Sequence, residues 1–239
     1  MISENFIKDL AKKYQTSELN VRREYFQHIF LSYFYQQAKA KNIFFKGGTA
    51  LRLIYNSPRF SEDLDFNSTS INDKEIEELL LNTLSQIEKE NITFDLKEAK
   101  KTTGGFLAII SFGADEQPVD IQIEISLREE EKRGEVIAIS SDFVPPYNVI
   151  SVTEEQLVFE KIRALLFRKK ARDFYDLYFI IRSRLSLPHK KDLFQELSET
   201  LKDSNINFEK ELKQFLPRSH WTIIRDFKAT LNKELNRFI

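Results

Sequence analysis

Cysteine is absent from the 239-residue sequence, which excludes disulfide bonds, cysteine-ligated zinc or iron–sulfur sites, and thiol nucleophiles. Glycine and proline are scarce, at six residues each, so long flexible linkers and low-complexity segments are not expected. His28, His189 and His220 lie far apart in the sequence, which argues against a metal site built from several histidines. No apolar run reaches about 18 residues, and the N-terminal residues lack the apolar core of a signal peptide, so we expect a cytoplasmic protein without a membrane span.

The charges balance, with 36 Lys and Arg against 37 Asp and Glu and a formal net charge of −1. A polybasic coat for nucleic acid is therefore excluded, but a local basic patch is not. Residues 160–191 contain ten Lys or Arg and three Asp or Glu, a local net charge of +7. Although such a run is often only a solvated helix face, it could also attract a triphosphate and an RNA backbone.

The pattern of apolar residues changes along the chain and predicts two domains. Up to about residue 150 the pattern indicates mixed helices and strands, and afterwards it indicates helices alone, so we expect an α/β domain over 1–150 and a helical domain over 151–239. Thr153 followed by Gln156 predicts a capping box at the start of the helical part. We expect helices at 17–41, 49–55, 71–90, 153–168, 171–184, 190–202 and 221–238, and strands at 42–46, 62–67, 92–97, 106–112 and 119–126.

Two carboxylates two residues apart, Asp63 and Asp65, lie in one of the predicted strands. Residues i and i+2 of a strand point to the same face, so these two acids would repel each other without a counter-ion. A divalent ion such as Mg²⁺, which takes one or two carboxylates together with substrate phosphates, would resolve the repulsion. The simpler alternative is a solvated strand edge that carries the two acids by chance.

A third carboxylate is available from the strand predicted over 119–126. Its isoleucines alternate with polar residues, so that Asp120 and Glu124 lie together on the polar face. If this strand lies beside the one that carries Asp63, three carboxylates converge and could hold two metal ions for a phosphoryl transfer. An ordinary half-buried strand with a wet polar face explains the same pattern.

Gly47 and Gly48 form a turn between a predicted strand and a predicted helix. Glycine lets the backbone approach a ligand closely, and a helix N-terminus offers free N–H groups to an anion. The turn matches neither a Walker loop nor a dinucleotide-binding fingerprint. A paired-glycine turn followed by a strand that carries Asp63 and Asp65 is more specific than either feature alone, and it predicts a phosphate cradle beside a metal site.

The residues around these motifs resemble the AbiEii/AbiGii toxin family, to which the MenT toxins are related. The likeness covers about residues 40–180 and depends on four segments in order: FKGGTAL from Phe45, RFSEDLDF from Arg59, EKIRALL from Glu160 and RDFYDLY from Arg172. The family consists of nucleotidyltransferases of the DNA polymerase β superfold that act as toxins of type IV toxin–antitoxin and abortive-infection systems. The resemblance therefore implies a polymerase β-like domain with a mixed sheet, followed by a C-terminal helical bundle.

The resemblance also implies roles for individual residues. Asp63, Asp65 and Glu124 would hold Mg²⁺ or Mn²⁺, with Asp120 as the competing third acid; we prefer Glu124 because the residues around it are similar to the family's third strand. Asp173 would assist the acceptor hydroxyl or hold the basic cluster, with Asp176 as its competitor. The remaining predicted nucleotide-binding residues are Gly47, Gly48, Thr49, Arg59, Ser61, Lys161 and Arg163, of which Lys161 would bind the phosphates. Gly48 occupies a position at which many members of the superfold have serine.

By resemblance, the protein would transfer a nucleoside monophosphate from an NTP to an RNA, with the 3′ end of a tRNA as the expected acceptor, and so block growth or translation. An antitoxin would be encoded nearby, and no stable complex with it is required. Two alternatives stay open. The acceptor could be a small molecule or a protein, or the chain could be a nucleotide-binding protein without catalytic activity.

Overall fold

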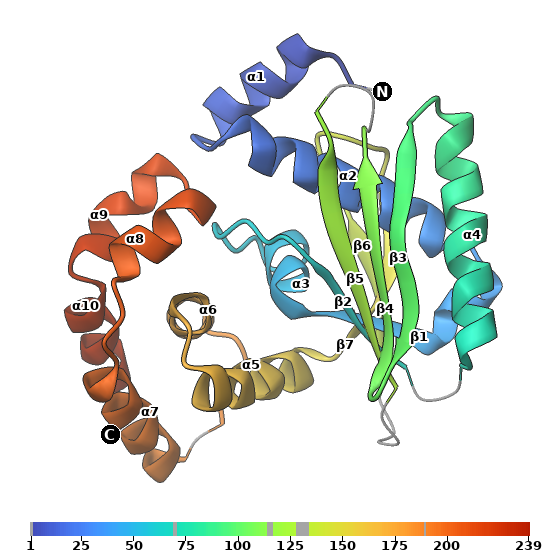
Figure 1. Ribbon diagram of the computed structural model, residues 1–239. Helices are drawn as coiled ribbons and strands as arrows, with labels where there is room; N and C mark the ends of the chain where they lie inside the picture. Colours follow the sequence, from blue (N-terminus) through green and yellow to red (C-terminus); the bar gives the residue numbers. More distant parts are fainter. Residues whose placement is uncertain (1, 69–70, 114–116, 128–133, 189) are drawn as a thin grey trace. The chain divides into compact units, whose positions relative to one another are not determined.

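The computed structural model describes residues 2–68, 71–113, 117–127, 134–188 and 190–239, so His189 lies outside the described residues. The described chain is a mixed α/β structure (Figure 1). Its α-helices are α1 (Glu4–Lys13), α2 (Glu18–Phe34), α3 (Gly47–Leu53), α4 (Asp73–Lys89), α5 (Glu154–Arg168), α6 (Ala171–Arg182), α7 (Lys191–Asp203), α8 (Phe208–Leu212), α9 (Trp221–Arg225) and α10 (Phe227–Leu235). None of these helices is long and apolar enough to cross a membrane.

Seven described strands form one sheet in the order β3-β4-β5-β2-β1-β7-β6. β2 pairs with β5 and β1 pairs with β7 in parallel, while the other neighbours are antiparallel. The strands are β1 (Ile43–Lys46), β2 (Leu64–Ser68), β3 (Phe94–Thr102), β4 (Gly105–Phe112), β5 (Val119–Leu127), β6 (Gly134–Ile139) and β7 (Tyr147–Val152). The mixed sheet that the sequence led us to expect is therefore confirmed.

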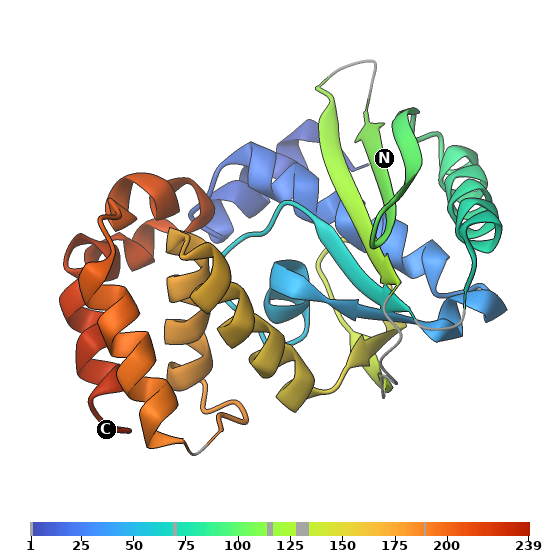
Figure 2. The same ribbon diagram turned by 60° about the horizontal axis from the view of Figure 1, so that its bottom comes forward.

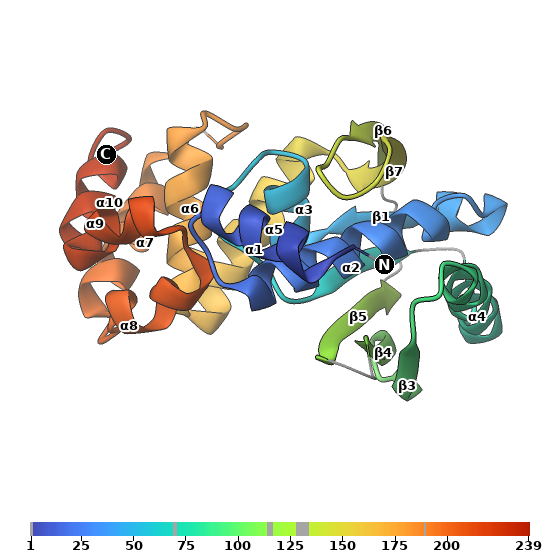
Figure 3. The same ribbon diagram turned by 90° about the horizontal axis from the view of Figure 1, so that it is seen from above.

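The alternating pattern of β5 explains how the sheet divides into a buried and a polar face. Ile121 and Ile123 are fully buried, and β5 contacts the long helix α2. Phe26 of α2 stacks on Phe112 of β4 with ring centroids 5.2 Å apart. Helix α4 packs against α2 and also contacts β3 and β4 (Figure 3). The polar side chains of β5 consequently project from the face opposite its buried isoleucines.

The chain divides into two compact units. The first contains the chain up to Lys13, Ser17–Asn56 and Phe60–Val152, and so includes the whole sheet. The second contains Tyr14–Thr16, Ser57–Arg59 and Thr153–Ile239. The expected boundary at 150/151 falls close to Thr153, but two short segments from the N-terminal part belong to the helical unit.

The second unit is built from α5 to α10 (Figure 2). Thr153 caps α5, because its hydroxyl accepts a hydrogen bond from the Gln156 backbone N–H at 3.4 Å. The Gln156 side chain donates to Glu160 rather than closing the predicted capping box. Helix α6 contacts α5, α8 and α10, and Phe174 and Tyr175 lie buried in this interior.

Several elements differ from the sequence-based expectations. The short helix α3 begins at Gly47 rather than at Thr49, and β2 begins at Leu64, so Asp63 directly precedes the strand. The helix expected over 221–238 is divided at Asp226 into α9 and α10. Helices α1 and α8 and strands β6 and β7 were not expected. β6 is an edge strand whose residues are mostly exposed, so it lacks the apolar alternation that reveals β5.

Candidate active site

Two of the predicted carboxylates lie side by side in the sheet. In the parallel pairing of β2 with β5, Asp65 is the register partner of Glu124. Register partners on adjacent strands project their side chains to the same face, and the strands are about 4.8 Å apart. Asp63 lies two residues before Asp65, with the fully buried Leu64 between them. The sheet therefore positions Asp65 and Glu124 together, with Asp63 next to them along the chain.

Asp120 occupies a different place from Glu124. It lies opposite Ser111 of β4. On β5 the pairing with β2 starts at Ile123, so Asp120 has no register partner on β2. The Lys97 ammonium group donates to both Asp120 carboxylate oxygens, at 2.9 and 3.1 Å. These hydrogen bonds from Lys97, helped by one from Ser111, lower the pKa of Asp120. Asp120 is thus engaged in an exposed ion pair, and the strand register favours Glu124 as the third acid.

The carboxylates supply only oxygen ligands, which is the chemistry that Mg²⁺ and Mn²⁺ prefer. Among the described residues, no three His, Asp or Glu side chains are grouped closely enough to form a complete metal-binding cluster. The Glu124 carboxylate instead accepts a hydrogen bond from the amide of Gln122, on the same face of β5. The residues therefore fit an ion that takes one or two carboxylates and completes its shell with water and phosphate oxygens, as Mg²⁺ commonly does.

Gly47 lies against the carboxylate of Asp65. Its φ of +83° is in the left-handed region that favours glycine, and a Cβ placed there would lie 2.8 Å from Asp65 Cβ and Cγ. The Asp65 Oδ2 would be closer still. Gly48 follows as a buried residue of α3. The glycine turn thus makes room for Asp65, a function that the sequence pattern alone did not indicate.

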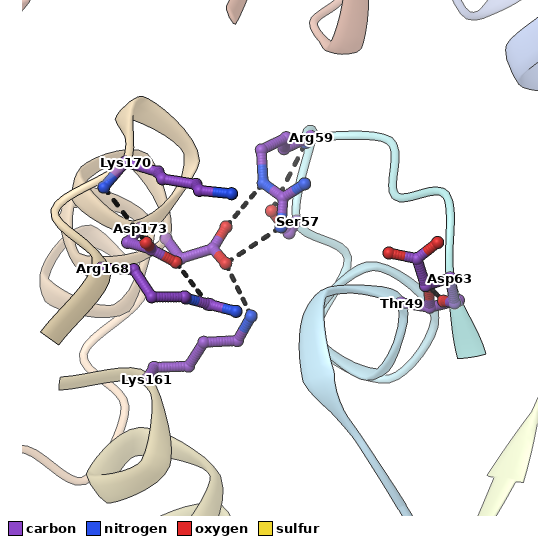
Figure 4. Close-up of polar contacts among 9 residues, drawn as sticks. Thr49, Ser57, Arg59, Asp63, Lys161, Arg168, Lys170 and Asp173 are labelled. Atoms are coloured by element: carbon purple, nitrogen blue, oxygen red, sulfur yellow. Dashed lines mark hydrogen bonds and ion pairs between the residues drawn. The ribbon is translucent and has the colours of Figure 1, made fainter. Parts of the chain in front are cut away.

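Thr49 has a structural role in this turn. Its side chain is fully buried, and its hydroxyl donates a hydrogen bond to the backbone carbonyl of Asp63 (Figure 4). We expected Thr49 to contact the nucleotide, but its hydroxyl is already used within the protein. The contact ties α3 to the residue that begins the pair of carboxylates, so Thr49 positions Asp63.

The segment before Asp63 is held by α2 and α3. The Ser61 carbonyl accepts a hydrogen bond from the Gln27 side chain at 3.1 Å. The Arg52 guanidinium lies 4.0 Å from the centroid of the buried Phe60 ring, a cation–π contact. The Ser61 side chain is half-buried, and its predicted contact with the nucleotide stays a prediction.

The second unit contains a buried cluster of one acid and two cations. Arg59 Nε and Nη2 donate to the two Asp176 carboxylate oxygens at 2.7 and 2.9 Å, and Lys161 Nζ lies 2.7 Å from Oδ2. In Figure 4 the dashed lines from Arg59 and Lys161 meet at one carboxylate. Burial would raise the pKa of Asp176, but the charges and hydrogen bonds of Arg59 and Lys161 outweigh it and lower the pKa to about 2. Asp176 is therefore an ionised carboxylate that fixes both cations.

Asp173 lies one helical turn earlier and binds a different cation. Arg168 Nη2 donates to Asp173 at 2.6 Å, and the Lys170 backbone N–H donates to the same carboxylate at 3.3 Å (Figure 4). Asp173 thus holds the basic segment and the start of α6, which is one of the two roles we considered. Arg163 is exposed and lies over the Phe159 ring at 5.6 Å, and its predicted contact with the nucleotide stays a prediction.

The predicted residues therefore form groups within each unit. In the first unit, Asp65 is beside Glu124 and Gly47, while Asp120 pairs with Lys97. In the second, Arg59 and Lys161 share Asp176. Sequence reasoning missed Arg168, the cation that binds Asp173, although it opens the basic run at the end of α5. Its spacing of five residues from Asp173 across a helix junction is not a standard helical pairing, so no sequence rule identified it.

Comparisons with known proteins agree with this architecture. The family model of the nucleotidyl transferase AbiEii toxin of type IV toxin–antitoxin systems matches residues 29–236. The solved structure of MenT4, a nucleotidyltransferase toxin from Mycobacterium tuberculosis, superposes with a TM-score of 0.66 at 16% identity, covering 100% of this chain and 90% of MenT4. The structure of JHP933 from Helicobacter pylori has a TM-score of 0.57 at 21% identity, covering 93% of this chain and 95% of JHP933.

No curated protein matches the sequence closely enough to add to this comparison. The two structural likenesses establish the fold, and the family model extends over most of the chain, including all four sequence segments that carry the resemblance. The chain therefore belongs to the AbiEii family of type IV toxin–antitoxin nucleotidyltransferases.

Proposed function

We propose that this nucleotidyltransferase transfers a nucleoside monophosphate from an NTP to the 3′ hydroxyl of an RNA, with the acceptor end of tRNA as its target. In this reaction the 3′ oxygen forms a bond to the α-phosphorus while the bond to the β-phosphate oxygen breaks and pyrophosphate leaves. The hydroxyl proton is lost to solvent or to a nearby base. The growth-arresting outcome follows because an RNA blocked at its 3′ end loses its normal use.

The observation that carries the proposal is the arrangement of Asp65, Glu124 and Gly47. Two acids on adjacent parallel strands face the same side, and a glycine leaves space beside one of them. Exposed acids that serve only solubility do not require a left-handed glycine next to them. The arrangement supports a site at which the fold brings carboxylates together to bind a cation.

The acids are suited to hold Mg²⁺ or Mn²⁺. We assign Asp63 and Asp65 as the main ligands and Glu124 as the third, because Asp120 is engaged by Lys97. When bound, the divalent ion supplies positive charge that stabilises the phosphate oxygens of the transferring group. Thr49 holds the backbone of Asp63, so that the first carboxylate starts from a fixed position.

The family resemblance gives Lys161 of the second unit a role in binding phosphate oxygens of the NTP. Lys161 has three N–H donors, of which one is directed to Asp176, so two can bind phosphate oxygens. The ion pair with Asp176 holds the Lys161 ammonium group in place. This phosphate-binding role of Lys161 is the one implied by the family, and Lys161→Gln tests it directly.

The experiment incubates purified protein with tRNA, Mg²⁺ and each α-³²P-labelled NTP in turn, and measures label in the RNA. Asp65→Asn keeps the size of the side chain but removes its charge, and we expect a loss of rate of about a hundredfold or more. Asp120→Asn is the matched control, since it removes a carboxylate from the same face of the sheet. We expect this control to retain most of the activity.

The same transfer assay decides the acceptor, and a separate co-expression experiment tests the partner. Absence of label in any RNA overturns the proposal; label in a small molecule or a protein moves the activity to that acceptor. NTP binding by calorimetry without turnover would indicate a binding protein. The type IV family also implies an antitoxin, and co-expression with the neighbouring gene tests whether it relieves growth arrest without a stable complex.

A further inference from the structure

Helix α5 exposes two large aromatic side chains. Phe167 is 89% exposed and Phe159 is 56% exposed, whereas the opposite side of the helix buries Leu157, Val158, Ile162 and Leu165. Most phenylalanines in the described chain are buried in the core. The positions of Phe159 and Phe167 are therefore not explained by core packing. The exposed rings therefore suggest a surface that contacts another molecule.

The two rings are aligned along the helix with an arginine between them. Phe159, Arg163 and Phe167 follow each other at intervals of four residues, which places them on one face. The Arg163 guanidinium lies over the Phe159 ring at 5.6 Å. Eight residues of helix span about 12 Å, a length that corresponds to about three or four nucleotides stacked at 3.4 Å.

The aromatic face continues into positive charge. Residues 161–172 contain six Lys or Arg and no acid. Within the described part of the chain, Arg163, Lys169 and Lys170 make no ion pair, and all three are exposed. Lys169 has a left-handed φ of +51° and ends α5, so the chain turns at this point and presents Lys169 and Lys170 beyond Phe167. At the other end, the exposed Glu155 limits the surface with a negative charge.

We propose that this surface, consisting of Phe159, Arg163, Phe167, Lys169 and Lys170, binds single-stranded RNA. The bases stack on the two rings, and the cations contact the phosphates, as in other proteins that bind single strands without reading their sequence. The inference rests on the proposed function in that the bound strand belongs to the acceptor RNA.

The chemistry favours a single strand over other partners. The rings form a narrow stripe rather than a broad apolar patch, and charge interrupts them, which suits alternating bases and phosphates better than a protein core or a lipid surface. Double-stranded RNA keeps its bases stacked within the helix, so it offers no open base faces to Phe159 and Phe167.

The test measures binding by fluorescence anisotropy, using an unstructured, fluorescein-labelled RNA of twelve nucleotides and the full-length protein without NTP. Phe159→Ala and Phe167→Ala should each weaken binding by about 5- to 100-fold. Leu81→Ala, which removes a 58% exposed apolar side chain from α4, is the matched control and should leave binding unchanged. Circular dichroism confirms that each variant is folded.

Charge is tested separately from stacking. The double variant Lys169→Gln/Lys170→Gln should weaken binding and make the plot of log K against log salt shallower by about 1.4, which corresponds to two lost phosphate contacts. Lys74→Gln, which removes an exposed lysine of α4, is its control. If the lysines matter but neither phenylalanine does, the surface is only electrostatic and the stacking proposal is wrong.

Two further outcomes would overturn the proposal. One is equal affinity for an RNA duplex of the same length, and the other is binding of this surface to anionic vesicles in place of RNA. The assay needs neither NTP nor turnover, so its result is independent of the transfer reaction. Transfer to RNA with unchanged binding by the phenylalanine variants rejects only this inference. Stripe-dependent RNA binding without any transfer rejects only the proposed function.

Discussion

The carboxylate of Asp65 fills the space in which a side chain on Gly47 would begin. The two residues are adjacent across the β1–β2 ladder, where Asp65 is paired with Lys46, the residue before Gly47. A left-handed glycine and a carboxylate therefore depend on each other. Without the Asp65 carboxylate, position 47 would have space for a side chain, and a side chain at position 47 would displace the carboxylate.

Gly47→Ala should affect both stability and activity. The added Cβ overlaps Asp65, and the alanine must adopt a φ of +83°, which costs about 1–3 kcal/mol of unfolding free energy. Displacement of the Asp65 carboxylate should also abolish most nucleotide transfer. Urea unfolding and the transfer assay measure the two effects. Gly104→Ala is the control, since a Cβ there meets no atom within 4 Å. Normal transfer by Gly47→Ala would contradict the assigned role.

Thr49 should act through its hydroxyl on Asp63 and not through the nucleotide. Thr49→Val keeps the shape but removes the buried donor, leaving the Asp63 carbonyl without it, at a cost of about 1–3 kcal/mol. We expect kcat to fall while KM for the NTP changes little. Thr49→Ser restores the donor and should recover most of the activity. A large rise in KM in Thr49→Val alone would indicate direct nucleotide contact instead.

Arg59→Met should destabilise the second unit strongly. Of the two cations that bind the buried Asp176, the substitution removes Arg59 and leaves Lys161. Breaking a buried ion pair of this kind costs about 3–5 kcal/mol of unfolding free energy. Arg59→Lys retains the charge but loses the two-pronged geometry, so it should fall between Met and wild type. Arg182→Met removes a 54% exposed arginine from its pair with Glu234 and should cost about 1 kcal/mol or less. Equal losses in urea unfolding for Arg59→Met and Arg182→Met would show that burial of the pair is unimportant.

His28 should stay neutral far below its ordinary pKa. Burial, followed by the charge of Arg52, lowers the pKa of His28 from 6.5 to about 3. Because the unfolded chain binds this proton more readily, the stabilising contribution is complete above pH 6.5 and declines toward pH 3, by about 1.4 kcal/mol per pH unit. When the pH falls from 7 to 5, the free energy of unfolding of His28→Gln should therefore decrease by about 2 kcal/mol less than that of the wild type. An NMR titration that gives His28 an ordinary pKa would refute the expectation.

The strands with clear alternation were predictable, and the choice among acids was not. The pattern of isoleucines predicted 119–126, and β5 is observed over Val119–Leu127. Asp120 and Glu124 share one face of that strand, so sequence periodicity treats them alike. Only the pairing with β2, decided by residues far away in the sequence, separates them. Strand register is a long-range property, and a single sequence carries little information about it.

The burial of individual side chains could also not be predicted from the sequence. A threonine after two glycines suggests an exposed hydroxyl at a helix start, but α3 begins at Gly47 and places Thr49 inside. Conversely, phenylalanines at 159 and 167 look like core residues by composition, and they are exposed because the apolar side of α5 is already complete without them. In both cases the decisive factor is which side of a helix faces the core.

The distribution of the chain between its two units limits how this toxin can be rearranged. Ser57–Arg59 and Tyr14–Thr16 belong to the helical unit, where Gln15 accepts hydrogen bonds from the backbone N–H groups of Arg218 and Ser219 at 3.0 Å each. A fragment cut at Thr153 would lack these segments, and Asp176 would lose Arg59. The C-terminal helices are therefore not a modular cassette, and recombination between relatives should succeed only when the loop at 57–59 and the helical unit are inherited together.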